Sequence, residues 1–230
     1  MMALPASYGL YAPGAIPNAH MILLSHLEST LGDDTGNNSL SLYTGTLDTG
    51  TKKWGTASLK GTASGGGCKV DGNLTSFNWS GPWTIEAWFL INSVINQARI
   101  FCATDSSFSK PVLLYMDSSG HIVLTNGSSG ITSTATWNDG NWHIVQAVYD
   151  GSGGGFGHTN LYIDGSAANA QNNGAIYGSH VATPYITIGA RSVNGTTAAQ
   201  WWDGWIDEVR IDDIARSASV PTGPYTIFSP

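Results

Sequence analysis

The segment Asp139-Gly140-Asn141-Trp142-His143-Ile144-Val145-Gln146-Ala147-Val148-Tyr149-Asp150-Gly151 decides the fold class of this chain. A run rich in β-branched and aromatic residues, from Trp142 to Tyr149, lies between two Asp-Gly pairs. In such pairs glycine supplies the positive φ that a tight turn needs, and the Asp side chain can bond to the following backbone. The pattern therefore predicts a buried strand with a turn at each end.

The same pattern recurs along the chain, with short apolar runs separated by clusters of Gly, Asn, Asp and Ser. No segment shows sustained helical periodicity, and only Asp212 to Ser219 is expected to form a turn or two of helix. The chain is therefore predicted to be all-β, a two-sheet antiparallel sandwich. The predicted strands are Ile22–Leu24, Trp83–Leu90, Val112–Tyr115, His121–Leu124, Trp142–Tyr149, Leu161–Ile163, Tyr185–Ile188 and Trp205–Ile211.

The composition excludes several classes of protein. Of the 230 residues 41% are hydrophobic and only 11% are charged, so the polar surface consists mainly of Ser, Thr, Asn and Gly. The net charge is −7 and the nine Lys and Arg residues are scattered, which predicts no nucleic-acid partner. No apolar stretch is long enough to span a bilayer, so no membrane insertion is expected. Cys68 and Cys102 are too few for a disulfide scaffold and are predicted to be reduced core thiols.

The chain is predicted to contain one domain, residues 20–230, preceded by an extended arm, residues 1–19. Pro5, Pro13 and Pro17 prevent the arm from forming a helix or pairing in a sheet. The longest flexible stretches of the domain are the expected locations of binding residues if the fold presents them on loops. These stretches are Gly151–Asn160, Gln171–Ser179 and Arg191–Gln200.

Five segments resemble, in the correct order, the laminin-G-like jelly roll of the concanavalin A-like lectin/glucanase superfamily. They are Trp83–Trp88, Asp139–Gly151, Leu161–Gly165, Ile186–Gly189 and Asp203–Ile211. The resemblance implies an antiparallel jelly-roll sandwich. It leaves the function open, because this superfamily includes lectins, enzymes, receptor modules and viral surface proteins.

The acidic residues argue against catalysis. Hydrolases of the superfamily use two acids on the same face of one strand, one on each side of the scissile bond. Glu86 has no acidic partner within its strand, and the adjacent Asp207 and Glu208 would point to opposite faces. The chain is therefore predicted not to be an enzyme. His143 shares a face with Val145 and is expected to be a hydrogen-bonded, partly buried side chain, although residue types alone leave a Ser-His-Asp triad open.

Calcium is the cofactor that the resemblance implies. The residues at the positions of the superfamily's calcium ligands are Glu28, Asp33, Asp34 and Asp207, with Glu28 where the family usually has Asp. Alternatively, Asp33 and Asp34 only form a turn, and Asp207 accepts hydrogen bonds from the backbone or from arginine. With regular pleating, Asp207 would share a core-facing side of its strand with Trp205, Val209 and Ile211.

The aromatic residues divide between strands and loops. Those within predicted strands, Trp83, Trp88, Trp142 and Trp205, are expected in the core. Others lie in or beside polar loops, where they could stack on a ligand or pack against the edge of the sandwich. These candidate ligand-binding residues are Trp201, Trp202, Tyr177, Phe156 and Trp137.

Three functions fit these features: a virion surface protein, a free carbohydrate-binding lectin and an enzyme accessory module. The virion protein, either capsid-decorating or tail-associated as in bacteriophages, is favoured because the chain shows no signal peptide and a single module. Its arm suits attachment to a neighbouring subunit, with Tyr8 and Tyr11 as anchors. Expected partners are other virion proteins or further copies of the chain, and surface glycans; the alternative lectin would be extracellular.

Overall fold

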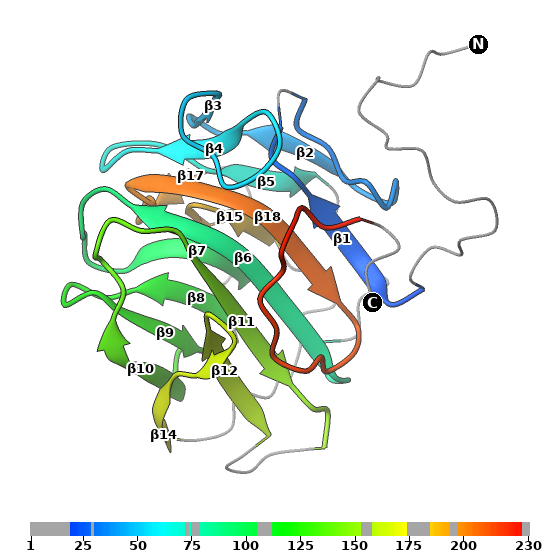
Figure 1. Ribbon diagram of the computed structural model, residues 1–230, viewed down its shortest axis with the longest axis vertical. Coiled ribbons are helices and arrows are strands. Elements are labelled where there is room, and N and C mark those ends of the chain that lie inside the picture. The colour runs from blue at the N-terminus through cyan, green and yellow to red at the C-terminus, as the bar shows by residue number, and fades with distance from the viewer. Residues whose placement is uncertain are drawn as a thin grey trace.

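The computed structural model describes residues 19–28, 30–71, 74, 79–104, 112–152, 158–173, 185–193 and 197–226. In this part of the chain, two antiparallel sheets pack face to face and no helix is present (Figure 1). The all-β, two-sheet prediction is thus confirmed. None of the described residues form a helix with the length and apolar character that crossing a membrane requires.

The front sheet is nearest the viewer in Figure 1 and has eight strands among the described residues. Its order is β13 (Ser166–Ala167), β12 (Thr159–Ile163), β11 (His143–Tyr149), β6 (Trp83–Ile91), β18 (Gly204–Asp212), β4 (Ser58–Gly61) and β3 (Thr46–Asp48), with β1 (Met21–Ser25) also paired to β18.

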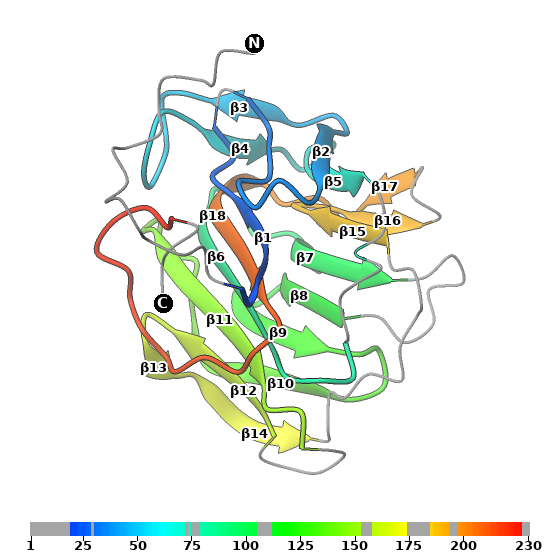
Figure 2. The same ribbon diagram turned by 90° about the vertical axis from the view of Figure 1, so that its right-hand side faces the viewer.

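The back sheet also has eight strands among these residues and lies behind the front sheet, as the turned view in Figure 2 shows. Its order is β14 (Asn169–Asn173), β10 (Gly130–Thr136), β9 (His121–Thr125), β8 (Val112–Met116), β7 (Ala98–Thr104), β15 (Tyr185–Ile188), β5 (Cys68–Asp71) and β2 (Ser39–Leu42). A separate hairpin pairs β16 (Arg191–Val193) with β17 (Thr197–Ala199).

Alternating side chains of the two sheets form the core between them. On β6, Ile85, Ala87 and Phe89 face the back sheet and belong to the main hydrophobic cluster. Glu86 and Trp88, between them in sequence, point to the opposite, outer face of the front sheet. Each fully buried large apolar side chain contributes about 1.5–3 kcal/mol. Both cysteines are free and buried, as predicted, and burial raises the pKa of the Cys68 thiol.

All eight predicted strands are present, with ends that differ by at most a few residues. The three Asp-Gly turns are also confirmed, since Gly140, Gly151 and Gly165 have φ of 82°, 79° and 74°. At the β12–β13 hairpin Asp164 is left-handed as well, with φ of 51°, as a type I′ turn requires. The predicted loop Arg191–Gln200 instead contains the β16–β17 hairpin, and Gln171–Ser179 begins within β14.

Residues 213–226, which we call the C-terminal strap, cross the outer face of the front sheet (red in Figure 1). Hydrogen bonds from its backbone to side chains of the sheet hold it there. Ser219 N donates to Gln146 Oε1 at 3.0 Å, and Tyr225 N donates to Glu208 Oε2 at 2.9 Å. The helical turns predicted within Asp212–Ser219 do not form. Backbone groups of this segment bond to the sheet instead: Ile214 O and Arg216 N to Thr84 Oγ1, and Ser219 N to Gln146.

A bulge in β18 changes which side chains face the core. The pairing of β18 with β6 shifts between Asp207 and Arg210, and Glu208 has a φ of 51°. Beyond the bulge Val209 belongs to the main core cluster, whereas Asp207 before it pairs with the outward-facing Trp88. The prediction that Asp207 and Val209 share a core face is therefore wrong, because it assumed a regular pleat.

Candidate functional site

A row of half-buried side chains crosses one end of the outer face of the front sheet. The register places Leu90 of β6 opposite Trp205 of β18, and Trp205 opposite Lys60 of β4. Trp142 directly precedes β11, whose His143 pairs with Phe89, so this residue continues the row beside Leu90. All four side chains are partly exposed to solvent. We call Trp142, Leu90, Trp205 and Lys60 the platform.

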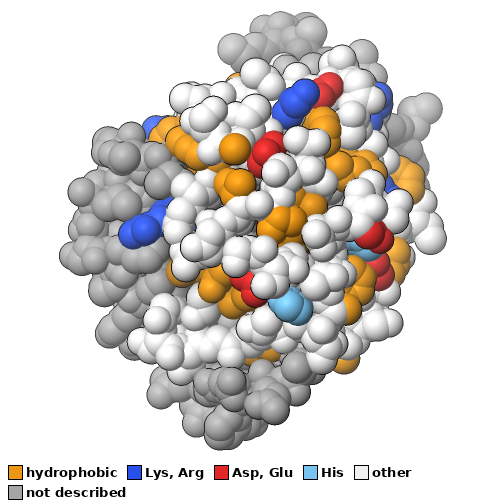
Figure 3. All heavy atoms as spheres, turned by 90° about the vertical axis from the view of Figure 1, so that its left-hand side faces the viewer, with side chains coloured by type: hydrophobic (Ala, Val, Ile, Leu, Met, Phe, Trp, Pro, Cys, Tyr) orange, Lys and Arg blue, Asp and Glu red, His pale blue; other side chains and the backbone are white. Residues whose placement is uncertain are grey.

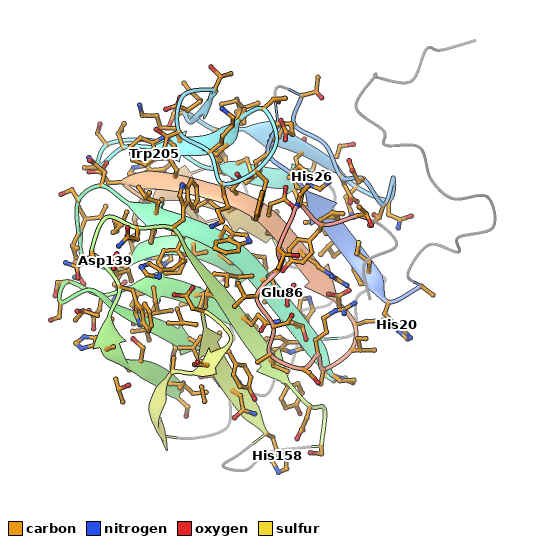
Figure 4. The ribbon with its side chains drawn as sticks, viewed as in Figure 1. His20, His26, Glu86, Asp139, His158 and Trp205 are labelled. Atoms are coloured by element: carbon orange, nitrogen blue, oxygen red, sulfur yellow. The ribbon has the colours of Figure 1, made fainter. Side chains whose placement is uncertain are left out.

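Trp205 combines an apolar ring with charged neighbours. Its indole Nε1 donates to Asp48 Oδ2 at 2.9 Å, and Lys60 Nζ lies 5.3 Å from the ring centroid. Lys60 Nζ also lies 3.3 Å from Asp48 Oδ2. The hydrogen bonds from Trp205 and from the Gly50 backbone lower the pKa of Asp48 to about 2, so its carboxylate stays ionised at neutral pH. Together with Asp48, the platform therefore offers an aromatic surface, an ammonium group and a carboxylate within one small area around Trp205, which Figure 4 labels.

Further aromatic side chains lie next to the platform on the same face. Trp88 lies two residues before Leu90 on β6, on the same face of the sheet. Trp54 packs edge-on against Trp88, with their ring centroids 6.5 Å apart. Lys53 Nζ is 4.0 Å from the Trp88 ring centroid. The indole nitrogens of Trp54 and Trp88 have no hydrogen-bond acceptor in the part of the chain that the structure describes. Figure 3 shows the side of the molecule that contains this end of the sheet, where hydrophobic side chains are scattered among polar ones, with acidic and basic side chains between them.

Asp207 holds this aromatic region in place. Its Oδ2 accepts hydrogen bonds from Lys53 N at 2.8 Å and from Trp54 N at 3.1 Å, and its Oδ1 accepts from Glu208 N at 2.9 Å. Burial raises the pKa of Asp207 to about 7, although these hydrogen bonds act in the opposite direction. The carboxyl group thus anchors the loop that lays Trp54 and Lys53 over Trp88.

The aromatic residues that the sequence assigned to a ligand are dispersed. Trp202 is only 1% exposed and packs in the core, so it cannot stack on a ligand in this conformation. Trp137 is half-buried, with its ring 5.1 Å from that of His143, and Trp201 remains partly exposed. Tyr177 and Phe156, like Tyr8 and Tyr11 in the arm, lie outside the described residues.

Two tryptophans expected in the core lie in the platform instead. Trp142 and Trp205 are partly exposed, whereas Trp83 and Trp88 are buried as predicted. Sequence reasoning also missed Lys60, whose position between the core residue Leu59 and Gly61 was the only signal that it faces outward.

The four predicted calcium ligands are engaged in separate interactions. Asp33 closes a turn, accepting from Leu24 N and Thr35 N at 3.0 Å each, as the alternative interpretation predicts. Glu28 Oε2 accepts from Thr56 N at 2.7 Å. Asp34 Oδ2 lies 3.1 Å from His26 Nε2, and Asp207 accepts the three backbone hydrogen bonds described above. Within the described residues no three His, Cys, Asp or Glu side chains are grouped to hold a metal.

His143 and His158 do not form a hydrolytic triad with the described residues around them. His143 is buried, with Nδ1 at 2.7 Å from Asp164 Oδ2 and Nε2 at 2.9 Å from Asp139 Oδ1, which confirms the structural role predicted for it. Ser152 Oγ and Asp150 Oδ2 both lie next to the same nitrogen of His158, Nδ1, at 2.6 Å and 2.9 Å. A triad requires the hydroxyl and the carboxylate on different ring nitrogens.

Glu86 and Asp212 of the front sheet lie beneath the strap. Glu86 is buried near the middle of the sheet, where it bonds to Gln146, and burial raises its pKa (Figure 4). Asp212 forms ion pairs with Arg210 at 2.7 Å and with Arg216 at 2.8 Å. These carboxyl groups are covered rather than aligned along an open cleft.

Solved structures share this fold at low sequence identity. Domain 4 of AbnA, a GH43 extracellular arabinanase from Geobacillus stearothermophilus in complex with arabinotriose, matches with a TM-score of 0.59 and 14% identity, over 86% of this chain and 95% of that one. The binding domain of botulinum neurotoxin serotype D/C matches with a TM-score of 0.61 and 16% identity, over 86% of this chain and 50% of that one.

A Trypanosoma rangeli sialidase matches with a TM-score of 0.60 and 14% identity, over 88% of this chain and 32% of that one. The chain thus spans half of the neurotoxin domain and about a third of the sialidase. At these identities the likeness shows the fold alone. A search of curated protein sequences finds no match.

A family profile gives the more specific result, because it matches the sequence itself over residues 60–219. This range begins in β4 and extends into the C-terminal strap, so it includes most of both sheets. The chain belongs to the Laminin_G_3 family of the concanavalin A-like lectin/glucanase superfamily.

Proposed function

We propose that this chain is a non-catalytic glycan-binding module and that the platform is its binding site. The observation that carries the proposal is the row of partly exposed Trp142, Leu90 and Trp205, with Lys60 and Asp48 at its end. A sugar ring has an apolar C–H face that packs on aromatic rings, and hydroxyl groups that bond to charged groups at the edge. The platform presents both kinds of partner on strands of a rigid sheet.

The comparisons support this class of ligand. A domain of the same fold has been solved in complex with arabinotriose, and another is a toxin binding domain. The absence of catalysis is supported by the covered acids of the front sheet and by the histidine contacts described above. Binding, without cleavage, is the activity that we propose.

We further propose that the module works on the surface of a virion, as a capsid-decorating or tail-associated protein of a bacteriophage. The proline-containing sequence of residues 1–19 supports this role, since it suits attachment to a neighbouring protein. The alternative is a stand-alone extracellular lectin. Detecting the chain in purified particles supports the first role, and finding it only as a free protein in the culture supernatant supports the second.

Trp205→Ala is expected to weaken glycan binding by roughly 10- to 100-fold, because truncating a central aromatic anchor typically costs about 1–3 kcal/mol. The ring is partly exposed, so the fold should remain intact. A glycan array with the full chain identifies the ligand, and isothermal titration with that ligand measures the change in Kd. Trp142→Ala should weaken binding in the same direction.

Trp201→Ala is the matched control, because Trp201 is partly exposed but lies outside the platform. Its Kd should stay within about twofold of the original value. Loss of binding in this variant with retention in Trp205→Ala would move the site to the loop that the sequence favoured. A chain that binds no glycan on the array would refute the proposed function.

Calcium binding by Glu28, Asp33, Asp34 and Asp207 stays a prediction drawn from the family resemblance. If calcium binds, free metal at about a hundred times its Kd should stabilise the fold by about 2.7 kcal/mol. The chain should then melt at a lower temperature in EDTA, and Asp207→Asn should abolish that difference. Identical melting in EDTA and in excess calcium would leave Asp207 with its structural hydrogen bonds alone.

A further inference from the structure

Arg99 is a buried cation on the outer face of the back sheet. It lies near the start of β7, which is flanked by β8 and β15, with β16 nearby (Figure 2). The residue is only 2% exposed. Its Nη2 donates to Gln200 Oε1 at 2.7 Å and to Gln97 Oε1 at 3.2 Å, but among the described residues Nε and Nη1 have no hydrogen-bond partner.

No carboxylate compensates this charge within the part of the chain that the structure describes. None of the ion pairs between described residues includes Arg99. The Arg99 guanidinium lies 4.5 Å from the ring centroid of Tyr115. Burial lowers the pKa of Arg99, and the neighbouring Arg191 cation acts in the same direction. A buried charge without a partner of opposite sign costs several kcal/mol, so such groups are normally paired.

The two glutamines that contact Arg99 have unusual backbone conformations. Gln97 has a φ of 59° and Gln200 has a φ of 50°, values that non-glycine residues seldom adopt. The backbone carbonyl of Gln200 also accepts a hydrogen bond from Arg99 N at 3.1 Å, which joins the two segments. This arrangement holds two neutral amide oxygens where a negatively charged oxygen would be the stronger partner of a guanidinium.

We propose that Arg99 is the centre of an oxyanion-binding site, in which a carboxylate or sulfate group of a ligand replaces the glutamine amide ends at the Arg99 guanidinium. Gln97 and Gln200 are partly exposed, so their side chains can move aside to admit the anion. The anion would supply the missing negative charge and accept hydrogen bonds from Nε and Nη1 of Arg99. This site lies on the back sheet and does not depend on the platform of the front sheet.

The test is the melting temperature of the full chain in sodium sulfate and in sodium chloride of equal ionic strength. Sulfate stabilises most proteins weakly and without saturation, through exclusion from the surface. A specific site adds a saturable increase on top of this trend. We expect the saturable increase in melting temperature in the original chain and in Lys52→Met, which removes an exposed cation. Arg99→Met should not show it.

Arg99→Met should also melt at or above the temperature of the original chain when sulfate is absent, because it removes an uncompensated buried charge. If this variant does not fold, Arg99→Lys and the saturation curve of the original chain provide the test. Melting temperatures in glucuronate, acetate and glucose identify the natural source of the anionic group. Saturation at lower concentrations of glucuronate than of acetate indicates an acidic sugar, equal responses to the two indicate a simple carboxylate, and a response to sulfate alone indicates a sulfate group.

Equal, non-saturating responses to sulfate in the original chain and in Arg99→Met would overturn the proposal. Trp205→Ala separates this site from the proposed function, since it should keep the full response to sulfate while losing glycan affinity. Loss of the sulfate response in Trp205→Ala, with an intact fold, would mean that the anion binds at the platform and would also refute the site at Arg99.

Discussion

Trp202→Ala is expected to lower the free energy of unfolding by about 3–5 kcal/mol, the typical cost of truncating a fully buried tryptophan. Trp202 packs edge-on against Phe89 at 5.7 Å, and its Nε1 donates to Leu90 O at 3.2 Å. The backbone of Trp202 is also tightly packed against Gly61. A Cβ atom added to Gly61 would lie 2.1 Å from Trp202 O. The surrounding strands therefore have little freedom to close the cavity.

In urea unfolding, Trp202→Ala should have a lower midpoint concentration of urea. The slope of the free energy of unfolding against urea should be unchanged. The matched variant is Trp201→Ala, which removes the same side chain one residue earlier from a partly exposed position. It should cost about 1 kcal/mol or less. Similar losses in the two variants would contradict the assignment of Trp202 to the core and return the pair to the role of exposed ligand-binding residues.

The free energy of unfolding of the original chain is expected to fall between about pH 6.5 and pH 10. His26→Gln should remove most of this fall. His26 Nδ1 lies 2.7 Å from Glu208 Oε1, and its Nε2 lies 3.1 Å from Asp34 Oδ2. Burial alone would lower the pKa of His26, but the hydrogen bonds and charges of Asp34 and Glu208 outweigh it and raise this pKa to about 10. The folded protein therefore keeps His26 protonated at neutral pH, where the unfolded chain releases the proton.

A raised pKa in the folded state means that the stabilisation is complete below the unfolded value of 6.5 and is lost as the pH rises to about 10. We expect a loss on the order of 3 kcal/mol over this range. Urea unfolding at intervals from pH 6 to pH 10 measures it. His20→Gln is the control, since the exposed His20–Asp213 pair should contribute little. An unchanged pH profile in His26→Gln would show that this histidine is not held between two ionised carboxylates.

The sequence predicted the fold where the signals are local. The strand from His143 to Tyr149 was located by its two Asp-Gly turns, and His143 was correctly assigned because strand parity places it on the same face as Val145. β7 was missed because all its residues, Ala98–Thr104, are buried and the segment shows no alternation of polar and apolar positions.

The candidate site was harder to predict because it depends on contacts between distant segments. The bulge at Glu208 reverses the parity of β18, so Trp205 points away from the core that Val209 enters. The loop that brings Trp54 to Trp88 is held by Asp207, which is more than a hundred residues away in sequence. Arg99 gave no signal at all, since its burial results from the assembly of the sheets.

The position of β18 has a consequence for how the protein is made. This strand lies between β6 and β4 and also pairs with β1, yet it is the last strand of the described chain. Its contacts join the beginning of the domain to its end, and folds with such long-range pairing typically form in milliseconds to seconds. A ribosome must therefore release nearly the whole domain before the front sheet can close. Until then β6 and β1 carry unpaired edges, which makes the nascent chain dependent on protection from aggregation.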